Sequence, residues 1–253
     1  MRKIIIFSIY MTIKLYISNM TITKKYNIKM LWDQAGDSVP EDFFDVSEFP
    51  CISKFEQCCL NLKSQNKEKY TMIELGSNQA YYSMLFRGII DGENKNQKCK
   101  NIMLEPTPAH MIRGKKHFLH NNFEGIFEEG GIGHYWCWDT RWHDKSLPSY
   151  TIDELMKKHE IEQLDVLHSD IDGNEIRLLE TSERAFKDKK INYIFLLTHG
   201  KWNESESTYS SKIIKYGDDR HEICKNFLLG CGYNLLLNVP LNVGYDGLLV
   251  FQA

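Results

Sequence analysis

Four ionisable side chains lie close together near the middle of the chain: His168, Asp170, Asp172 and Glu175. The residue pattern of 164–170 predicts a strand, and open α/β sheets bind their ligands at the carboxyl ends of such strands. The helix dipole favours acids at the start of a helix, which explains Asp172 and Glu175 without any function. It does not explain a histidine and an aspartate in a strand that should be buried. We therefore predict a catalytic site at this strand end.

A second group of polar residues follows two other predicted strands. Glu74 ends a strand over 70–75, and Gly76 opens the turn after it, where backbone N–H groups and a helix N-terminus can approach a ligand closely. Glu105 ends the next strand, over 101–105. An acid at that place in an open α/β sheet can accept both hydroxyls of a ribose. The two turns together predict a pocket for a nucleoside-bearing cofactor.

NAD and S-adenosylmethionine are the two cofactors that such a pocket suggests. NAD binding needs further glycines that let the pyrophosphate approach, and residues 77–80 after Gly76 contain none. S-adenosylmethionine has no phosphate. It needs a carboxylate and carbonyl groups for its ammonium and N–H groups for its own carboxylate, and Glu74 and the 76–78 turn provide these group types. The pattern therefore favours S-adenosylmethionine.

The rest of the chain predicts the elements that position these residues. Past residue 45, short apolar runs alternate with longer segments of helical period, which is typical of βαβ units and a mostly parallel sheet. Thr151 and Glu154 have the spacing of a capping box, Pro108 suits the first turn of a helix, and 134–150 is predicted to be irregular. The last two strands follow one another without a helix, so we expect an antiparallel hairpin at one edge of the sheet. The predicted helices are 51–65, 79–90, 108–120, 151–158, 173–186 and 210–229, and the predicted strands are 70–75, 101–105, 123–128, 164–170, 191–197, 233–238 and 247–251.

Composition and charge bound the class of protein. The chain has 253 residues, of which 42% are hydrophobic, enough for one sizeable α/β core. Its 31 basic and 34 acidic residues leave a formal net charge of −3, which speaks against general nucleic-acid binding. The seven cysteines include no CxxC pair, so we expect reduced thiols in a cytoplasmic protein rather than a zinc ribbon or a disulfide framework. We predict a single domain over 45–253, preceded by an extension over 1–44.

The start of the extension resembles part of a signal peptide, because Met1-Arg2-Lys3 precedes the apolar run 4–13. Lys14 interrupts the run, and no small-residue cleavage site follows it. About ten apolar residues are too few to span a bilayer, which takes roughly twenty. A weak membrane anchor, an extension without a role in the chemistry, and translated sequence upstream of a later start remain open. We favour the second and leave membrane association undecided.

Four short motifs follow one another along the chain. They are Glu74-Leu75-Gly76-Ser77-Asn78 with Tyr81-Tyr82-Ser83, then Leu104-Glu105-Pro106-Thr107-Pro108, then Thr151-Ile152-Asp153-Glu154-Leu155, then Asp170-Ile171-Asp172-Gly173-Asn174-Glu175. In this order they resemble the motifs of the FkbM-type methyltransferases, over about residues 70–252. The resemblance implies a class I, Rossmann-like α/β fold, with a seven-stranded, mostly parallel sheet, an antiparallel last strand and helices on both faces. It also implies S-adenosylmethionine as the methyl donor.

The resemblance also implies roles for single residues. Glu74, Gly76 and Asn78 would hold the methionine part of the cofactor, Glu105 its ribose, and Asp170 would lie beside the methyl group. Three positions depart from the family: Ala80 stands at a common glycine, His168 at a common lysine, and Thr198-His199 where an acid and a histidine are usual. The last two fall at the reacting centre and leave the acceptor open. The full predicted cofactor-binding set is Glu74, Gly76, Ser77, Asn78, Tyr82, Glu105, Pro106, Glu129 and Asp170.

The expected reaction is O-methylation. Methyl transfer to a hydroxyl needs a group that takes its proton, and His168, Asp170 and His199 are the candidates. Histidine titrates nearest neutral pH. We therefore predict that Asp170 orients the acceptor or the cofactor and that His168 or His199 takes the proton.

The acceptor is predicted to be a small molecule or glycan that binds Trp136, Trp138, Trp142 and Asp172, because tryptophan faces stack on sugar rings. An RNA ribose 2′-O-methyltransferase, disfavoured by the net charge, and a non-catalytic S-adenosylmethionine-binding module remain as alternatives. Asp170, Asp172, His199 and His221 include the ligand types of divalent ions. Nothing in their spacing forces them together, and we predict no metal.

Overall fold

The structure is a computed structural model that describes residues 25–29, 48–92, 98–133, 147–199, 219–240 and 247–253. Its centre is a seven-stranded sheet in the order β3-β2-β1-β6-β7-β9-β8. The first five of these strands are parallel, and β9 is antiparallel to both of its neighbours. This confirms the predicted sheet with its antiparallel end. The strands are β1 (Tyr70–Leu75), β2 (Cys99–Glu105), β3 (Ile126–Glu129), β6 (Leu164–Ser169), β7 (Ile191–Thr198), β8 (Asn234–Val239) and β9 (Gly247–Gln252).

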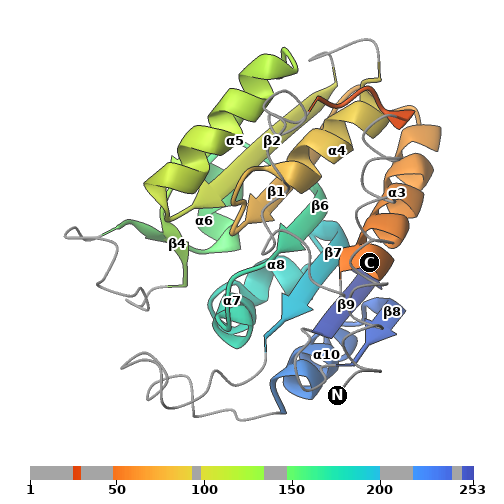
Figure 1. Cartoon of the computed structure of the whole chain (residues 1–253). Coiled ribbons are helices and arrows are strands. Elements are labelled where there is room, and N and C mark those ends of the chain that lie inside the picture. The colour runs from red at the N-terminus through yellow and green to blue at the C-terminus, as the bar shows by residue number, and fades with distance from the viewer. Residues whose placement is uncertain (1–24, 30–47, 93–97, 134–146, 200–218, 241–246) are drawn as a thin grey trace, which may run out of the picture.

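Helices cover both faces of the sheet, as Figure 1 shows. On one face lie α3 (Glu48–Ser64), α4 (Tyr81–Ile90) and α5 (Pro108–His120). On the other lie α6 (Ile152–Lys158), α7 (Glu175–Thr181), α8 (Glu183–Lys187) and α10 (Arg220–Gly230). Successive strand residues point to opposite faces, so Met72 enters the first core and Ile73 the second. The inner strands β1, β6, β7 and β9 are buried on both sides, which is why they appear in the sequence as mostly apolar runs, whereas the edge strands β3 and β8 are partly exposed.

The order in which the chain adds strands to the sheet reverses between β1 and β6. From β1 it moves outward to β2 and β3, and it then returns to place β6 on the other side of β1. In open α/β sheets, ligands bind outside the carboxyl ends of the strands at such a switch point. At this point Gly76 approaches the backbone of Asp170 so closely that a Cβ atom on it would lie 1.7 Å from the Asp170 carbonyl oxygen. The backbone of Gly76 also has a φ of +64°, which L side chains rarely adopt.

The structure corrects three details of the predicted elements. The helix expected over 173–186 is two helices, α7 and α8, which meet at Ser182, whose hydroxyl accepts a hydrogen bond from the N–H of Ile152 at 2.9 Å. The third strand begins only at Ile126. A small second sheet pairs β4 (Gly131–Ile132) with β5 (Ser149–Tyr150), which includes part of the segment predicted to be irregular.

Two predicted helix starts are confirmed. Thr151 and Glu154 form the full capping box of α6, and Pro108 occupies the first turn of α5. Most of the N-terminal extension and residues 210–218 of the last predicted helix lie outside the described residues. Within the described part of the chain, no helix combines the length and apolar character that crossing a bilayer requires.

Candidate active site

Most of the predicted site residues lie along one edge of the sheet. The carboxyl ends of the neighbouring strands β3, β2, β1, β6 and β7 lead, in this order, to Glu129, Glu105, Gly76, Asp170 and His199. Glu105 and Glu129 are direct register partners on adjacent strands. The parallel sheet therefore brings together residues that are far apart in the sequence.

The buried carboxylate of Glu74 holds the start of α4. Its two oxygens accept hydrogen bonds from the N–H groups of Tyr82, at 3.2 Å, and Ser83, at 3.0 Å. These N–H groups belong to the first turn of the helix and have no partner within it. Burial raises the pKa of Glu74 to about 8, although the two N–H donors act in the opposite direction. Glu74 therefore fixes the helix behind the glycine turn.

The carboxylate of Glu105 connects the two turns that were predicted to bind the cofactor. Oε2 accepts a hydrogen bond from the N–H of Asn78 at 2.7 Å, and Oε1 accepts one from the N–H of Thr107 at 2.8 Å. The N–H of Ser77 donates to the carbonyl of Leu104, also at the end of β2. The side chain of Asn78 is exposed on the outside of this turn, and Pro106 is buried beneath it.

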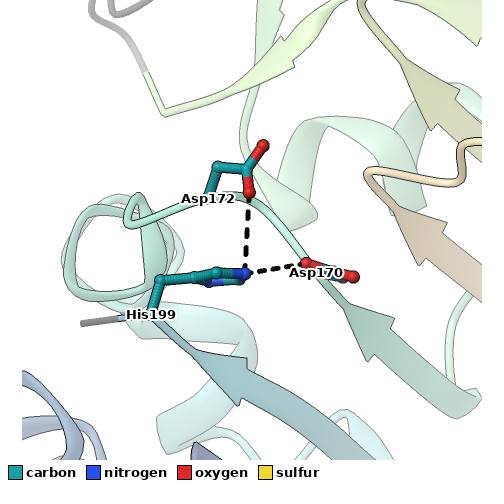
Figure 2. Close-up of side chains that lie close together, drawn as sticks. All are labelled: Asp170, Asp172 and His199. Carbon is teal, nitrogen blue, oxygen red and sulfur yellow. Dashed lines mark ion pairs between the residues drawn. The ribbon is translucent and has the colours of Figure 1, made fainter. Parts of the chain in front are cut away.

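Asp170, Asp172 and His199 converge at the ends of β6 and β7 (Figure 2). Nε2 of His199 lies 3.1 Å from Oδ1 of Asp170 and 3.6 Å from Oδ1 of Asp172. On the other side of the ring, Nδ1 lies 2.6 Å from Oε1 of Glu175, which is completely buried. The imidazole is thus held between a buried carboxylate and two carboxylates at the surface.

The charges of this cluster depend on one another. Burial alone would lower the pKa of His199, but Glu175 and Asp170 raise it well above its ordinary value. Burial likewise opposes the charged form of Asp170, but the hydrogen bond from His199 outweighs it and lowers the pKa of that carboxyl. Asp170 is therefore an ionised hydrogen-bond acceptor at neutral pH.

His168 lies apart from this cluster, in the core beneath α3 and α4. Its ring stacks on Tyr82, with centroids 3.8 Å apart, and faces the edge of Phe55. Cys51 Sγ lies 4.0 Å from its Nε2. Burial lowers the pKa of His168 to about 4, so the ring is neutral at physiological pH. Tyr82, predicted to bind the cofactor, is itself only 4% exposed in this packing.

The other predicted residues divide into two groups. His221 lies outside the cluster, because its ring nitrogens contact Thr198 Oγ1 at 2.7 Å and Asn238 Oδ1 at 2.8 Å. Trp136, Trp138 and Trp142 lie outside the described residues.

Glu175 is the residue of this site to which the sequence reasoning assigned no role. The only signal for it was an acid in the first turn of a helix, which the helix dipole explains equally well. Its contact with His199 follows from the tertiary structure.

A sheet of this order, with a glycine turn at the switch point, is that of the class I methyltransferase fold, and the cofactor is S-adenosylmethionine. The chain belongs to the FkbM methyltransferase family, because the family model described as "Methyltransferase FkbM domain" matches residues 64–235. No curated protein matches the sequence.

Several solved structures are similar to parts of this chain. The bifunctional kinase-methyltransferase WbdD is similar with a TM-score of 0.51 and 12% identity, over 89% of this chain and 42% of WbdD. The N-terminal domain of human METTL16, in complex with SAH, is 12% identical with a TM-score of 0.47, over 91% of this chain and 78% of that chain. M. capricolum TrmK, in complex with its cofactor product S-adenosyl-homocysteine, is 9% identical with a TM-score of 0.41, over 76% of this chain and 66% of that chain. At these identities the likeness concerns the fold alone.

Proposed function

We propose that the protein transfers the methyl group of S-adenosylmethionine to a hydroxyl of a sugar or glycan-type acceptor. The observation that carries this proposal is the contact between His199 and Asp170 at 3.1 Å, at the carboxyl ends of neighbouring strands and beside the glycine turn. A hydroxyl must lose its proton when it is methylated. A carboxylate paired with an imidazole is a suitable group to bind that hydroxyl and to take its proton.

The residues of the two turns fit the cofactor. Ser77 Oγ is buried and has no hydrogen-bond partner among the described residues, at the turn where the carboxylate of the methionine part would bind. Glu105, at the end of β2, would accept the ribose hydroxyls, and the exposed Glu129 beside it would face the base. Asp170, on the other side of the glycine turn, would then lie next to the methyl group.

The proposed reaction is a single displacement. The acceptor oxygen forms a bond to the methyl carbon, and the carbon–sulfur bond breaks with its electron pair remaining on sulfur. The hydroxyl proton goes to a carboxylate oxygen of Asp170, because the raised pKa of His199 keeps its ring protonated. His168 is left out of this step because its ring is buried against Tyr82 and its pKa, lowered to about 4, makes it a weak proton acceptor. Hydrogen bonds to Asp170 and His199 would hold the acceptor hydroxyl in position to attack the methyl carbon.

The charge of the site supports a neutral acceptor. Glu105, Glu129, Asp170 and Asp172 all lie along the carboxyl edge of the sheet. This row of acids would repel the phosphates of a nucleic acid, in agreement with the net charge of −3. A sugar hydroxyl can approach without this penalty, and the predicted stacking on Trp136, Trp138 and Trp142 would favour its ring.

The test uses labelled S-adenosylmethionine with a panel of neutral oligosaccharides, sugar nucleotides and structured RNA. We expect label in the neutral oligosaccharides, and we expect Asp170→Asn and His199→Gln to lower turnover by about 10²–10⁴-fold. Binding of S-adenosylmethionine, measured by calorimetry, should change little and so show that both variants are folded. Asp188→Asn, at an exposed position on the surface, is the control. Label in RNA alone, or unchanged turnover in both variants, would refute the proposal.

A further inference from the structure

We infer that Asp170, Asp172 and His199 form a binding site for one divalent transition-metal cation of the Mn²⁺ type. Each residue offers one ligand atom, and these atoms all lie within 4.8 Å of one another. The inference deepens the proposed function and rests on it for the role of the ion, but cation binding itself does not depend on methyl transfer. Figure 2 shows the two carboxylates converging on the same ring nitrogen.

The spacing of the three atoms is that of ligands around an ion. Nitrogen and oxygen ligands about 2.0–2.2 Å from a divalent metal lie roughly 3.0–3.5 Å from one another in tetrahedral or octahedral geometry. The distances from Nε2 of His199 to the two aspartate oxygens are 3.1 Å and 3.6 Å. A cation can therefore be bound with only small side-chain movements, and it would replace the proton that joins His199 to Asp170.

Glu175 provides a second observation that points to a cation. Its Oε1 accepts the hydrogen bond of Nδ1, which fixes the ring so that Nε2 faces the aspartates. Metal-binding histidines almost always have such an outer partner on the other ring nitrogen. The second oxygen of Glu175, Oε2, is buried without a hydrogen-bond partner among the described residues. A carboxylate that is exposed to water needs no counter-charge in the protein. Glu175 is completely buried, so its charge must be compensated by neighbouring groups.

The balance of charge leads to the same conclusion. Three carboxylates, those of Asp170, Asp172 and Glu175, surround a single imidazole. Even a fully protonated ring would neutralise only one of them. The carboxylates of Asp170 and Asp172, which are 37% and 64% exposed, therefore leave an excess of negative charge beside the ring that a divalent cation would compensate.

The ligand types select the class of ion. Ca²⁺ and Mg²⁺ prefer oxygen ligands alone, while an imidazole nitrogen suits transition metals. One imidazole with two carboxylates is therefore a site for Mn²⁺ or a related ion. In the proposed reaction the acceptor hydroxyl would be a further ligand, and its proton would go to the remaining oxygen of Asp170 while His199 holds the ion.

The test is a titration of the full chain with Mn²⁺, in which electron paramagnetic resonance measures the free ion. We expect one ion per chain. Asp172→Asn should weaken binding at least about tenfold, and Glu175→Gln, which removes the negative charge of the outer partner, about 10–100-fold. Asp172 has a side chain that is 64% exposed, so this variant should fold as the wild type does. Asp188→Asn, with a side chain that is 50% exposed, is the matched control and should bind Mn²⁺ normally.

The possible outcomes are distinct. No Mn²⁺ binding, or equal binding by wild type and Asp172→Asn, would overturn the inference. Displacement of Mn²⁺ by an equal concentration of Ca²⁺ would also overturn it, because it would mean that His199 is not a ligand. Specific Mn²⁺ binding without methylation of any acceptor would instead overturn only the proposed function. Methylation that persists in a chelator, together with no Mn²⁺ binding, would leave the proposed function and remove the ion.

Discussion

Gly76→Ala is expected to damage both the stability and the cofactor site, because the added methyl group has no space. The new Cβ would lie 1.7 Å from the carbonyl oxygen of Asp170, about half of a normal contact distance. This carbonyl cannot easily move, because the N–H of Asp170 is hydrogen-bonded to Leu75 at 3.0 Å. An alanine at the positive φ of residue 76 costs about 1–2 kcal/mol. If the backbone of Asp170 moves to make space, the loss of its hydrogen bond to Leu75 costs about 0.5–1.5 kcal/mol more, and the shift itself adds strain. We expect a total loss of about 3 kcal/mol or more.

A matched glycine separates the two effects. Gly92 also has a positive φ, +56°, but the nearest atom to its added Cβ would be Lys63 Nζ at 3.8 Å. Gly92→Ala should therefore lose only about 1 kcal/mol, since the substitution also restricts the unfolded chain. In thermal unfolding, each kcal/mol lowers the Tm of a chain of this size by about 2–4 °C. Calorimetric titration should show affinity for S-adenosylmethionine reduced at least about tenfold in Gly76→Ala and unchanged in Gly92→Ala. If the two variants unfold alike and both bind the cofactor normally, the close approach at Gly76 has no energetic importance.

Two further predictions concern buried charges. Arg87 and Asp91 form an (i, i+4) pair with side chains 3% and 0% exposed, whereas Arg184 and Asp188 form a pair of the same spacing with side chains 78% and 50% exposed. Asp91→Ala should lower the free energy of unfolding by about 3–5 kcal/mol and Asp188→Ala by less than about 0.5 kcal/mol, and equal losses in urea unfolding would contradict this. The second prediction is a pH dependence, because the pKa of Glu74 is raised to about 8 in the folded protein and its ordinary value is 4.5. As pH rises, the folded state therefore keeps this proton to a higher pH than the unfolded state does. The free energy of unfolding of the wild type should fall between about pH 4.5 and pH 8, by up to about 1.4 kcal/mol per pH unit. Urea unfolding of Glu74→Gln over the same range should show a shallower slope, and a parallel slope would show that Glu74 is ionised throughout.

Local signals predicted the layers and the sheet well. The inner strands are buried on both faces, so they appear as mostly apolar runs. Two helices have strong start signals, the capping box of Thr151 and the first-turn Pro108. The parallel order then makes the strands end at one edge. This is why strand ends alone predicted Glu105 and Asp170 at one edge of the sheet, whereas His199 was predicted with the help of the family resemblance.

The roles of the two histidines could not be predicted in the same way. His168 and His199 both follow apolar strand residues, and the sequence alone offered both as bases. His168 lies within β6, so the alternation of the strand turns its ring into the core beneath α3 and α4. His199 lies just past the end of β7, where its ring lies between Glu175 at the start of α7 and the aspartates after β6. Whether a residue falls within a strand or just beyond it depends on the pairing of neighbouring strands, which local pattern does not report.

The register of β6 and β7 explains why the cluster forms where it does. Ser169, the last residue of β6, pairs with Leu196, so β7 extends past the end of its neighbour before it reaches His199. The chain after β6 meanwhile turns through Asp172, with a φ of +47°, and starts α7 at Glu175. The overhang of β7 and the early start of α7 place the imidazole between the carboxylates of one short segment. A pairing shifted by one residue would send His199 to the opposite face of the sheet. The cluster therefore depends on the register of two buried strands, and core substitutions that disturb this register should impair the site without touching any of its residues.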